Sequence, residues 1–177
     1  MDAFEQLASE LFFANGYWVQ NSLKVDLTKE EKVAIGRPSS PRWEIDLVAY
    51  SGGENRLLAL ECKSFLDSSG VAINEFLPDS TSSRYKLFRE DETRDIVLNR
   101  MKSDLIAKGF ISADCKISFG LVAAKIRPKD YDALPQYFAK RGWDLYGPNW
   151  IKSEVKRLAG SGYSNDVSAV VAKILLR

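Results

Sequence analysis

Three charged residues, Asp46, Glu61 and Lys63, stand in or beside two apolar segments of the sequence. These segments, residues 45–50 and 57–60, flank a stretch rich in Ser, Gly and Asn, a pattern that predicts a β-hairpin. Side chains alternate along a strand, so Glu61 and Lys63 are expected to share one face. Burying charge is costly unless the charge is paired or binds a metal ion. The pattern therefore predicts either an ion pair or a reactive site.

The hairpin is expected to bring two carboxylates together, because Asp46 begins one strand and Glu61 ends its neighbour. Carboxylate oxygens suit Mg²⁺, which typically takes one or two carboxylates and keeps several waters. A lysine beside them can help to activate a water molecule or neutralise charge that develops on a phosphate. Asp46, Glu61 and Lys63 are thus chemically suited to hydrolysis of a phosphodiester bond.

Composition excludes several other chemistries. The chain has no histidine, which removes Ser-His-Asp and Cys-His catalysis, histidine general bases and histidine zinc sites. Its 25 basic and 24 acidic residues nearly cancel, whereas a dedicated nucleic-acid binder often carries a strongly basic balance. This balance argues mildly against tight nonspecific binding and leaves a local basic groove open.

The 177 residues fit one domain with a core of ordinary size. No apolar run approaches the roughly 20 residues that span a bilayer, and the first residues are acidic, unlike a signal peptide. Cys62 and Cys115 are interpreted as buried thiols in a reducing compartment. We therefore expect a cytoplasmic protein that does not enter membranes.

Hydrophobic spacing and turn residues predict the elements that position the hairpin. The remaining predicted strands are 17–25, 116–125 and the short 143–146. The predicted helices are 2–15, 84–108, about 131–141, about 149–158 and 166–176. Residues 26–42 and 65–83 are predicted loops, and the second follows Lys63 directly and has the length of a functional lid. The order predicts an α/β fold, a mixed sheet flanked by helices.

Glu5 lies at the edge of the apolar face of the first predicted helix, next to Phe12. It fits an ordinary solvated acid in a first helical turn, which the helix dipole favours.

The sequence resembles the PD-(D/E)XK, or restriction-endonuclease-like, nucleases, in which an Asp at a strand start precedes an acid-x-Lys unit on the next strand. Asp46 and Glu61-Cys62-Lys63 match this motif, although Ile45 stands where the family name has proline. The first helix, with Glu5, is similar to that of Mrr-type members. The order helix, three strands, helix, strand over residues 1–125 is also similar to the family core, with 126–177 as a helical elaboration.

The resemblance implies a metal-dependent nuclease that acts on nucleic acid, with DNA favoured over RNA. It implies that Asp46, Glu61 and Glu5 hold Mg²⁺ or Mn²⁺ and that Lys63 assists the attack on the phosphodiester. Many small nucleases of this kind cut two strands as homodimers, so a homodimer is a further expectation.

Two alternatives stay open. The chain can be a non-catalytic module of the same fold that binds nucleic acid or assembles a complex. Otherwise the charged residues can be a structural ion-pair network in a protein that binds a partner through its C-terminal helices. Trp143 and Trp150 lie near several basic residues, a combination seen on nucleic-acid surfaces. We predict that both tryptophans belong instead to the core and the ordinary surface.

Overall fold

Five strands form one mixed sheet in the computed structural model, which describes residues 2–39, 42–82 and 84–176. The excluded residues include parts of two predicted loops, 40–41 and 83. The strands lie in the order in which they occur in the chain: β1 (Trp18–Val25), β2 (Trp43–Ser51), β3 (Arg56–Lys63), β4 (Lys116–Ala123) and β5 (Asp144–Tyr146). β1, β2 and β3 pair antiparallel, whereas β3, β4 and β5 pair parallel. The predicted α/β class with a mixed sheet and a short last strand is confirmed.

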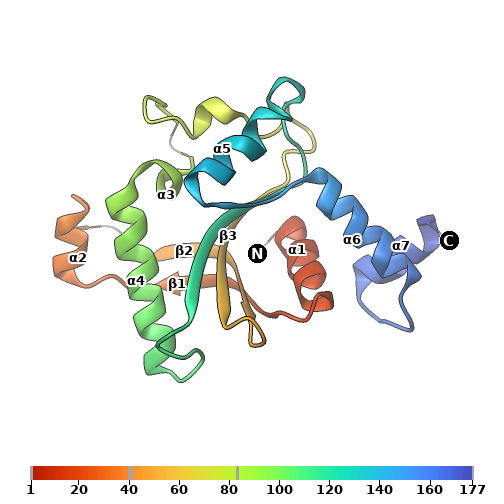
Figure 1. The fold of residues 1–177 in the computed structure, drawn as a ribbon, viewed down its shortest axis with the longest axis horizontal. Helices are drawn as coiled ribbons and strands as arrows, with labels where there is room; N and C mark the ends of the chain where they lie inside the picture. The colour runs from red at the N-terminus through yellow and green to blue at the C-terminus, as the bar shows by residue number, and fades with distance from the viewer. Residues whose placement is uncertain (1, 40–41, 83, 177) are drawn as a thin grey trace.

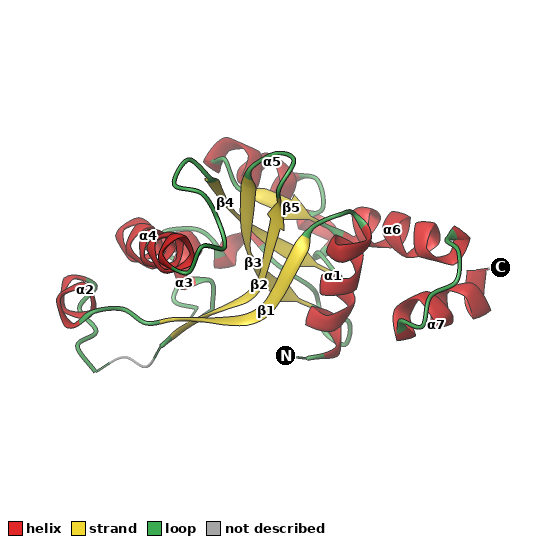
Figure 2. Ribbon diagram, turned by 90° about the horizontal axis from the view of Figure 1, so that it is seen from below, coloured by secondary structure: helices red, strands yellow, loops and turns green. Residues whose placement is uncertain are grey.

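Helices cover both faces of the sheet (Figures 1 and 2). The helices are α1 (Ala3–Ala14), α2 (Lys29–Ala34), α3 (Lys86–Arg89), α4 (Asp91–Ala107), α5 (Ala133–Arg141), α6 (Pro148–Gly160) and α7 (Val167–Leu176). In Figure 2, α3 and α4 lie on one side of the sheet and α1 and α6 on the other. α7 packs against α6 at the end of the molecule. Among the described residues, none of the helices has both the length and the apolar character needed to cross a membrane.

Strand alternation divides the core into two clusters. Leu57 and Ala59 pack with residues of α4 and α5, whereas Leu58, Leu60 and Cys62 pack with residues of α1 and α6. Both faces of β3 are therefore covered, which explains its nearly continuous apolar sequence. Burying each large apolar side chain contributes about 1.5–3 kcal/mol relative to exposing it.

α1, the predicted helix 2–15, begins at Ala3 after the cap residue Asp2. The Asp2 carboxylate accepts hydrogen bonds from the backbone N–H groups of Phe4 and Glu5, both at 2.8 Å. The Glu5 side chain in turn accepts from the backbone N–H of Asp2 at 3.1 Å, which completes a capping box. This reciprocal pair satisfies donors at the helix start that lack partners within the helix.

The structure differs from two of the predicted segments. The predicted loop 26–42 contains α2, which Thr28 and Glu31 start with a second capping box. The predicted helix 84–108 is divided into α3 and α4 at Glu90, whose backbone leaves the helical region (φ −102°, ψ 86°). Glu90 accepts a hydrogen bond from the guanidinium of Arg37 and another from the Thr93 hydroxyl. The contact with Arg37 joins residues 53 positions apart and is not visible in local helical spacing.

The Arg56 side chain of β3 holds the edge strand β5 through Asp144 and also contacts Ser118 of β4. Arg56 donates to both carboxylate oxygens of Asp144, at 2.8 and 2.7 Å, and to the Ser118 hydroxyl at 2.8 Å. Gly120 faces Asp144 in the β4–β5 register, and a Cβ at position 120 would lie 2.4 Å from the Asp144 carbonyl oxygen. The close approach of β4 and β5 therefore requires glycine at this position.

Candidate functional site

The hairpin strands separate at Asp46. Hydrogen bonding between β2 and β3 ends at the pair Leu47–Leu60, while β3 continues beside β4 as far as Lys63. The Asp46 carboxylate then accepts the backbone N–H of Cys62 through Oδ2, at 2.8 Å. In a longer hairpin, a backbone carbonyl of β2 would accept the Cys62 N–H. Here the Asp46 carboxylate accepts it instead, and this hydrogen bond fixes the carboxylate where the two strands separate.

The alternation of side chains between the two faces of the sheet also changes along β2 at this point. Ile45 and Val48 belong to the core cluster on the α4 side, whereas Leu47 belongs to the cluster on the α1 side. The regular alternation is therefore broken at Asp46, which lets its side chain turn toward β3. Opposite it in β1, Ser22 has a positive φ of 52° and is skipped in the pairing with β2. The pairs Asn21–Leu47 and Leu23–Ile45 keep one register across this point, so neither strand has an inserted residue.

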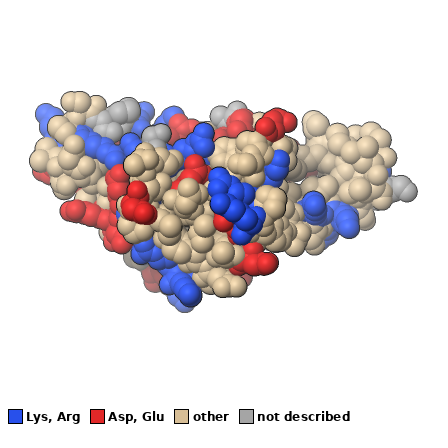
Figure 3. Space-filling model, turned by 90° about the horizontal axis from the view of Figure 1, so that it is seen from above, with Lys and Arg blue, Asp and Glu red and all other residues tan. Residues whose placement is uncertain are grey.

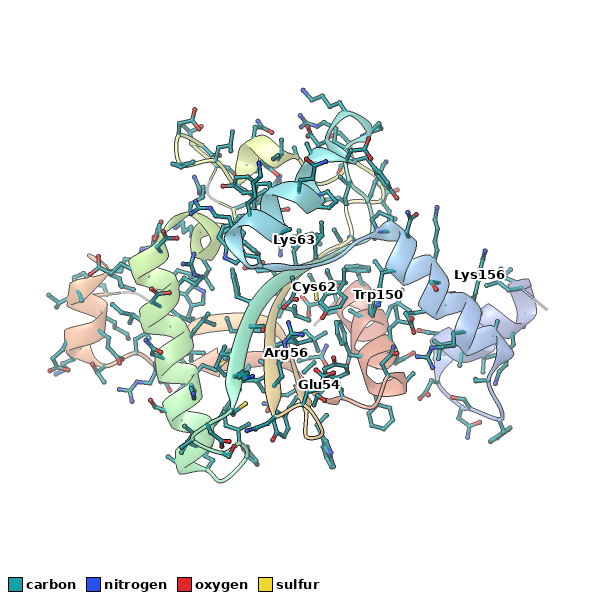
Figure 4. All side chains as sticks on the ribbon, in the orientation of Figure 1. Glu54, Arg56, Cys62, Lys63, Trp150 and Lys156 are labelled. Atoms are coloured by element: carbon teal, nitrogen blue, oxygen red, sulfur yellow. The ribbon has the colours of Figure 1, made fainter. Side chains whose placement is uncertain are left out.

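Lys63 joins the two predicted carboxylates. Its Nζ lies 2.9 Å from Glu61 Oε2 and 3.2 Å from Asp46 Oδ2, and it donates to the Cys62 carbonyl oxygen at 3.0 Å. The three charged side chains are 18 to 24% exposed, so solvent and small ions reach them. In Figure 4 Lys63 and Cys62 lie at one end of β3, and Arg56 lies at the other. The structure therefore brings Asp46, Glu61 and Lys63 together as the hairpin predicted.

The charges of this cluster depend on one another. Burial raises the pKa of Glu61, and the nearby charge of Asp46 raises it further, while Lys63 acts in the opposite direction. Burial alone would lower the pKa of Lys63, but the charges of Glu61 and Asp46 outweigh it, so this pKa is raised. Lys63 is thus an ammonium ion at neutral pH. It is suited to neutralise developing negative charge rather than to accept a proton.

Glu5 lies on the other face of the sheet, with α1. Burial raises the pKa of the Cys62 thiol, followed by the charge of Asp46, and the charge of Glu5 adds a smaller contribution. Glu5 is therefore near the buried side of Cys62, and its carboxylate also caps α1. Within the described ranges, no three acidic, cysteine or histidine side chains form a group with metal-binding geometry. The structure joins two of the three predicted carboxylates through Lys63.

Sequence analysis missed two residues beside this cluster, Tyr85 and Glu75. Burial raises the pKa of the Tyr85 hydroxyl, and the charges of Glu75 and Glu61 raise it further. Glu75 lies in a 3₁₀ turn, Ile73–Glu75, within the predicted loop that follows Lys63. Neither residue belongs to a recognisable motif. The sequence indicated only that the predicted loop containing Glu75 follows Lys63 directly.

The two tryptophans considered for a nucleic-acid surface pack with the core. Trp143 contacts the rings of Phe88 and Phe138, with centroid distances of 5.1 and 5.5 Å. Trp150 packs against Phe12 on the other side of the sheet, at 5.1 Å. This packing supports the prediction that both residues are structural.

Comparisons of the chain with protein-family models, with curated proteins and with solved structures found no match. The chemistry of Asp46, Glu61 and Lys63 is therefore the basis for a functional assignment.

Proposed function

We propose that this protein is a metal-dependent nuclease with a restriction-endonuclease-like core, a member of the PD-(D/E)XK group. It hydrolyses phosphodiester bonds of nucleic acid, and DNA is the favoured substrate. One observation carries the proposal: Lys63 contacts both Asp46 and Glu61 at the opening of the hairpin. A lysine and two carboxylates at one partly exposed point form a suitable set for phosphoryl chemistry.

The donor set fits Mg²⁺ or Mn²⁺. The Cys62 N–H and Lys63 Nζ both donate to Oδ2 of Asp46, so neither of these two bonds uses Oδ1. The proximity of Asp46 and Glu61 raises the pKa of Glu61 in addition to the effect of its burial, and a bound cation would relieve this repulsion. Asp46 and Glu61 would hold the ion with water in its remaining positions. Glu5 stays a candidate third ligand from α1.

Each residue then has a defined role. When bound, Mg²⁺ or Mn²⁺ supplies positive charge that activates water and stabilises the charge developing on the phosphate. The Cys62 N–H holds Asp46 in a fixed orientation. Lys63 places its ammonium beside the phosphate and orients the attacking water, consistent with its raised pKa.

The order of elements agrees with the proposal. α1, β1, β2, β3, α4 and β4 follow in the order helix, three strands, helix, strand, with the short α2 and α3 added between them. Figure 3 shows acidic and basic side chains intermixed on the face drawn there. This mixture and the net charge of +1 favour modest nonspecific affinity, so contacts close to the reacting phosphate would provide much of the binding.

A non-catalytic module is the second candidate, because Lys63 forms an ion pair with each of the two carboxylates. Calorimetric titration separates the two functions. A nuclease binds Mn²⁺ and loses this binding in Asp46→Asn, whereas a module held by an ion-pair network takes up no Mn²⁺ in either form.

The activity test offers plasmid, linear duplex, single-stranded DNA and RNA to the purified protein with Mg²⁺ or Mn²⁺. Asp46→Ala should abolish cleavage and Lys63→Ala should slow it at least about 10²-fold, while circular dichroism shows an intact fold. Lys108→Ala, at an exposed lysine just after α4, is the matched control and should cleave like the wild type. Failure of the wild type to cleave any of these substrates would remove the support for an enzyme.

A homodimer stays a prediction that accompanies the proposal. Cleavage of both strands of a duplex at one place requires two such sites, and a pair of chains would supply them. Sedimentation velocity over a range of protein concentrations, with and without duplex DNA, tests this prediction directly.

A further inference from the structure

The hydroxyl of Tyr85 is buried and has no hydrogen-bond partner among the residues that the structure describes. Tyr85 as a whole is only 3% exposed. Buried polar groups in proteins nearly always have a partner, and each exception calls for an explanation. A phenylalanine would fill the same apolar space without the cost of burying an unpaired hydroxyl.

The ring of Tyr85 is held on two sides. It packs against Phe76 with a centroid distance of 4.3 Å and against Phe88 at 6.1 Å. Its backbone is in the left-handed region, with φ 56° and ψ 35°, which is uncommon for an aromatic residue. Such conformations persist when the surrounding structure enforces them, and they concentrate at functional sites. The hydroxyl is therefore presented in a fixed position.

The Tyr85 hydroxyl is influenced by the charge of Glu61, one of the carboxylates of the candidate site. Tyr85 belongs to the same core cluster as Leu57 and Ala59, and the alternation of β3 continues on this face to Glu61. Beyond the effect of burial, the charges of Glu75 and Glu61 both raise the pKa of Tyr85. Glu75 already has a cationic partner in Arg84, at 3.4 Å.

We propose that Tyr85 is a positioning residue for Glu61: its hydroxyl donates to the Glu61 carboxylate when that carboxylate turns from Lys63 to a divalent cation. This inference rests on the proposed function. Side chains behind metal ligands commonly fix them through hydrogen bonds of this kind. In the structure Glu61 pairs with Lys63, and the Tyr85 hydroxyl has no partner among the described residues.

The proposal predicts opposite effects on two measurable quantities. Tyr85→Phe removes a donor that is unpaired without metal, so the urea midpoint of the metal-free protein should stay the same or rise. The same change removes a bond made with metal, so the Kd for Mn²⁺ should rise about tenfold to a hundredfold. A purely structural tyrosine would instead lower the midpoint and leave the Kd unchanged.

The test measures the Kd for Mn²⁺ by calorimetry and the urea midpoint without metal in four proteins. Wild type and Tyr163→Phe, a change at a 91% exposed tyrosine, should agree in both quantities. Glu75→Gln should bind Mn²⁺ like the wild type, which shows that Tyr85 serves Glu61 rather than Glu75. Tyr85→Phe should bind Mn²⁺ more weakly than the other three proteins, and its urea midpoint without metal should not fall.

Two results would overturn the inference and leave the proposed function standing: an unchanged Kd in Tyr85→Phe, or a loss of affinity accompanied by a lower metal-free midpoint. Loss of affinity in Glu75→Gln as large as that in Tyr85→Phe would also overturn the assignment to Glu61. If wild type and Tyr163→Phe bind no Mn²⁺, the proposed function fails and this inference fails with it.

Discussion

Lys63 Nζ lies 3.2 Å from Asp46 Oδ2, although the two residues are 17 positions apart on strands whose hydrogen bonding has already ended. The contact is made across the opening of the hairpin, and the same oxygen accepts the Cys62 N–H. Asp46 therefore has a structural and a proposed chemical role, and substitutions can separate the two.

Asp46→Ala is expected to destabilise the protein more than Asp46→Asn. Alanine leaves the partly buried Cys62 N–H without its acceptor, at a cost of about 1–3 kcal/mol. Asparagine keeps a carbonyl oxygen that accepts this bond, so most of the stability should be retained. Urea unfolding of both variants measures the difference. Equal free energies of unfolding would show that the bond to Cys62 contributes little.

Lys63→Met should make the free energy of unfolding increase as the pH falls from 8 to 5. The raised pKa of Lys63 means that its contribution is present below the unfolded value of about 10.4 and is lost as the pH rises through the folded value. Without this cation, the pKa of Glu61 should rise further, because burial and Asp46 both raise it. The variant should therefore gain free energy of unfolding between pH 8 and pH 5 as the pair takes up a proton.

Urea unfolding at the two pH values checks this expectation, with Lys108→Met as the matched control at an exposed lysine. The control should follow the wild type at both values. A Lys63→Met protein whose free energy of unfolding changes between pH 8 and pH 5 just as the wild type does would show that burial and Asp46 do not raise the pKa of Glu61 further in the variant.

Gly120→Ala should destabilise the edge of the sheet. A Cβ at this position would lie 2.4 Å from the Asp144 carbonyl oxygen, so β5 must shift away from β4. Overpacking of this kind costs roughly 1–3 kcal/mol. Gly160→Ala is the control, because a Cβ there meets nothing within 4 Å. Thermal unfolding should show a lower midpoint only for Gly120→Ala, and a normal midpoint would mean that β4 and β5 tolerate a wider spacing.

The two cysteine thiols should react slowly in the native protein. Both are buried, and burial raises the pKa of each, most strongly for Cys62. Because the thiolate is the reactive form, a thiol reagent at pH 8 should label neither residue quickly. Addition of denaturant should expose both. Rapid native labelling that disappears in Cys62→Ala would show that β3 opens at the site.

Much of the candidate site could be predicted because it depends on strand alternation and on one short turn. The hairpin pattern placed Glu61 and Lys63 on one face and Asp46 beside them, and the structure joins all three. The break in β2 at Asp46 could not be predicted, because it coincides with a positive φ at Ser22 and a side-chain bond to the backbone of Cys62, and no local pattern shows either feature.

Long-range contacts explain what sequence reasoning missed. The ring of Tyr85 is held by Phe76 and Phe88, and no local pattern specifies that packing. The division between α3 and α4 likewise depends on Arg37, which is 53 residues from Glu90. Glu5 had two interpretations, and the structure shows its capping bond to Asp2 while its role toward a metal stays a prediction.

The most direct test of the central claim compares Mn²⁺ binding and DNA cleavage in wild type and Lys63→Met. The variant keeps both carboxylates, so it should bind Mn²⁺ at least as tightly as the wild type. It should cleave DNA about 10²- to 10³-fold more slowly, because the cation beside the phosphate is gone. Cleavage at the wild-type rate by Lys63→Met, or no cleavage by either protein, would contradict the account.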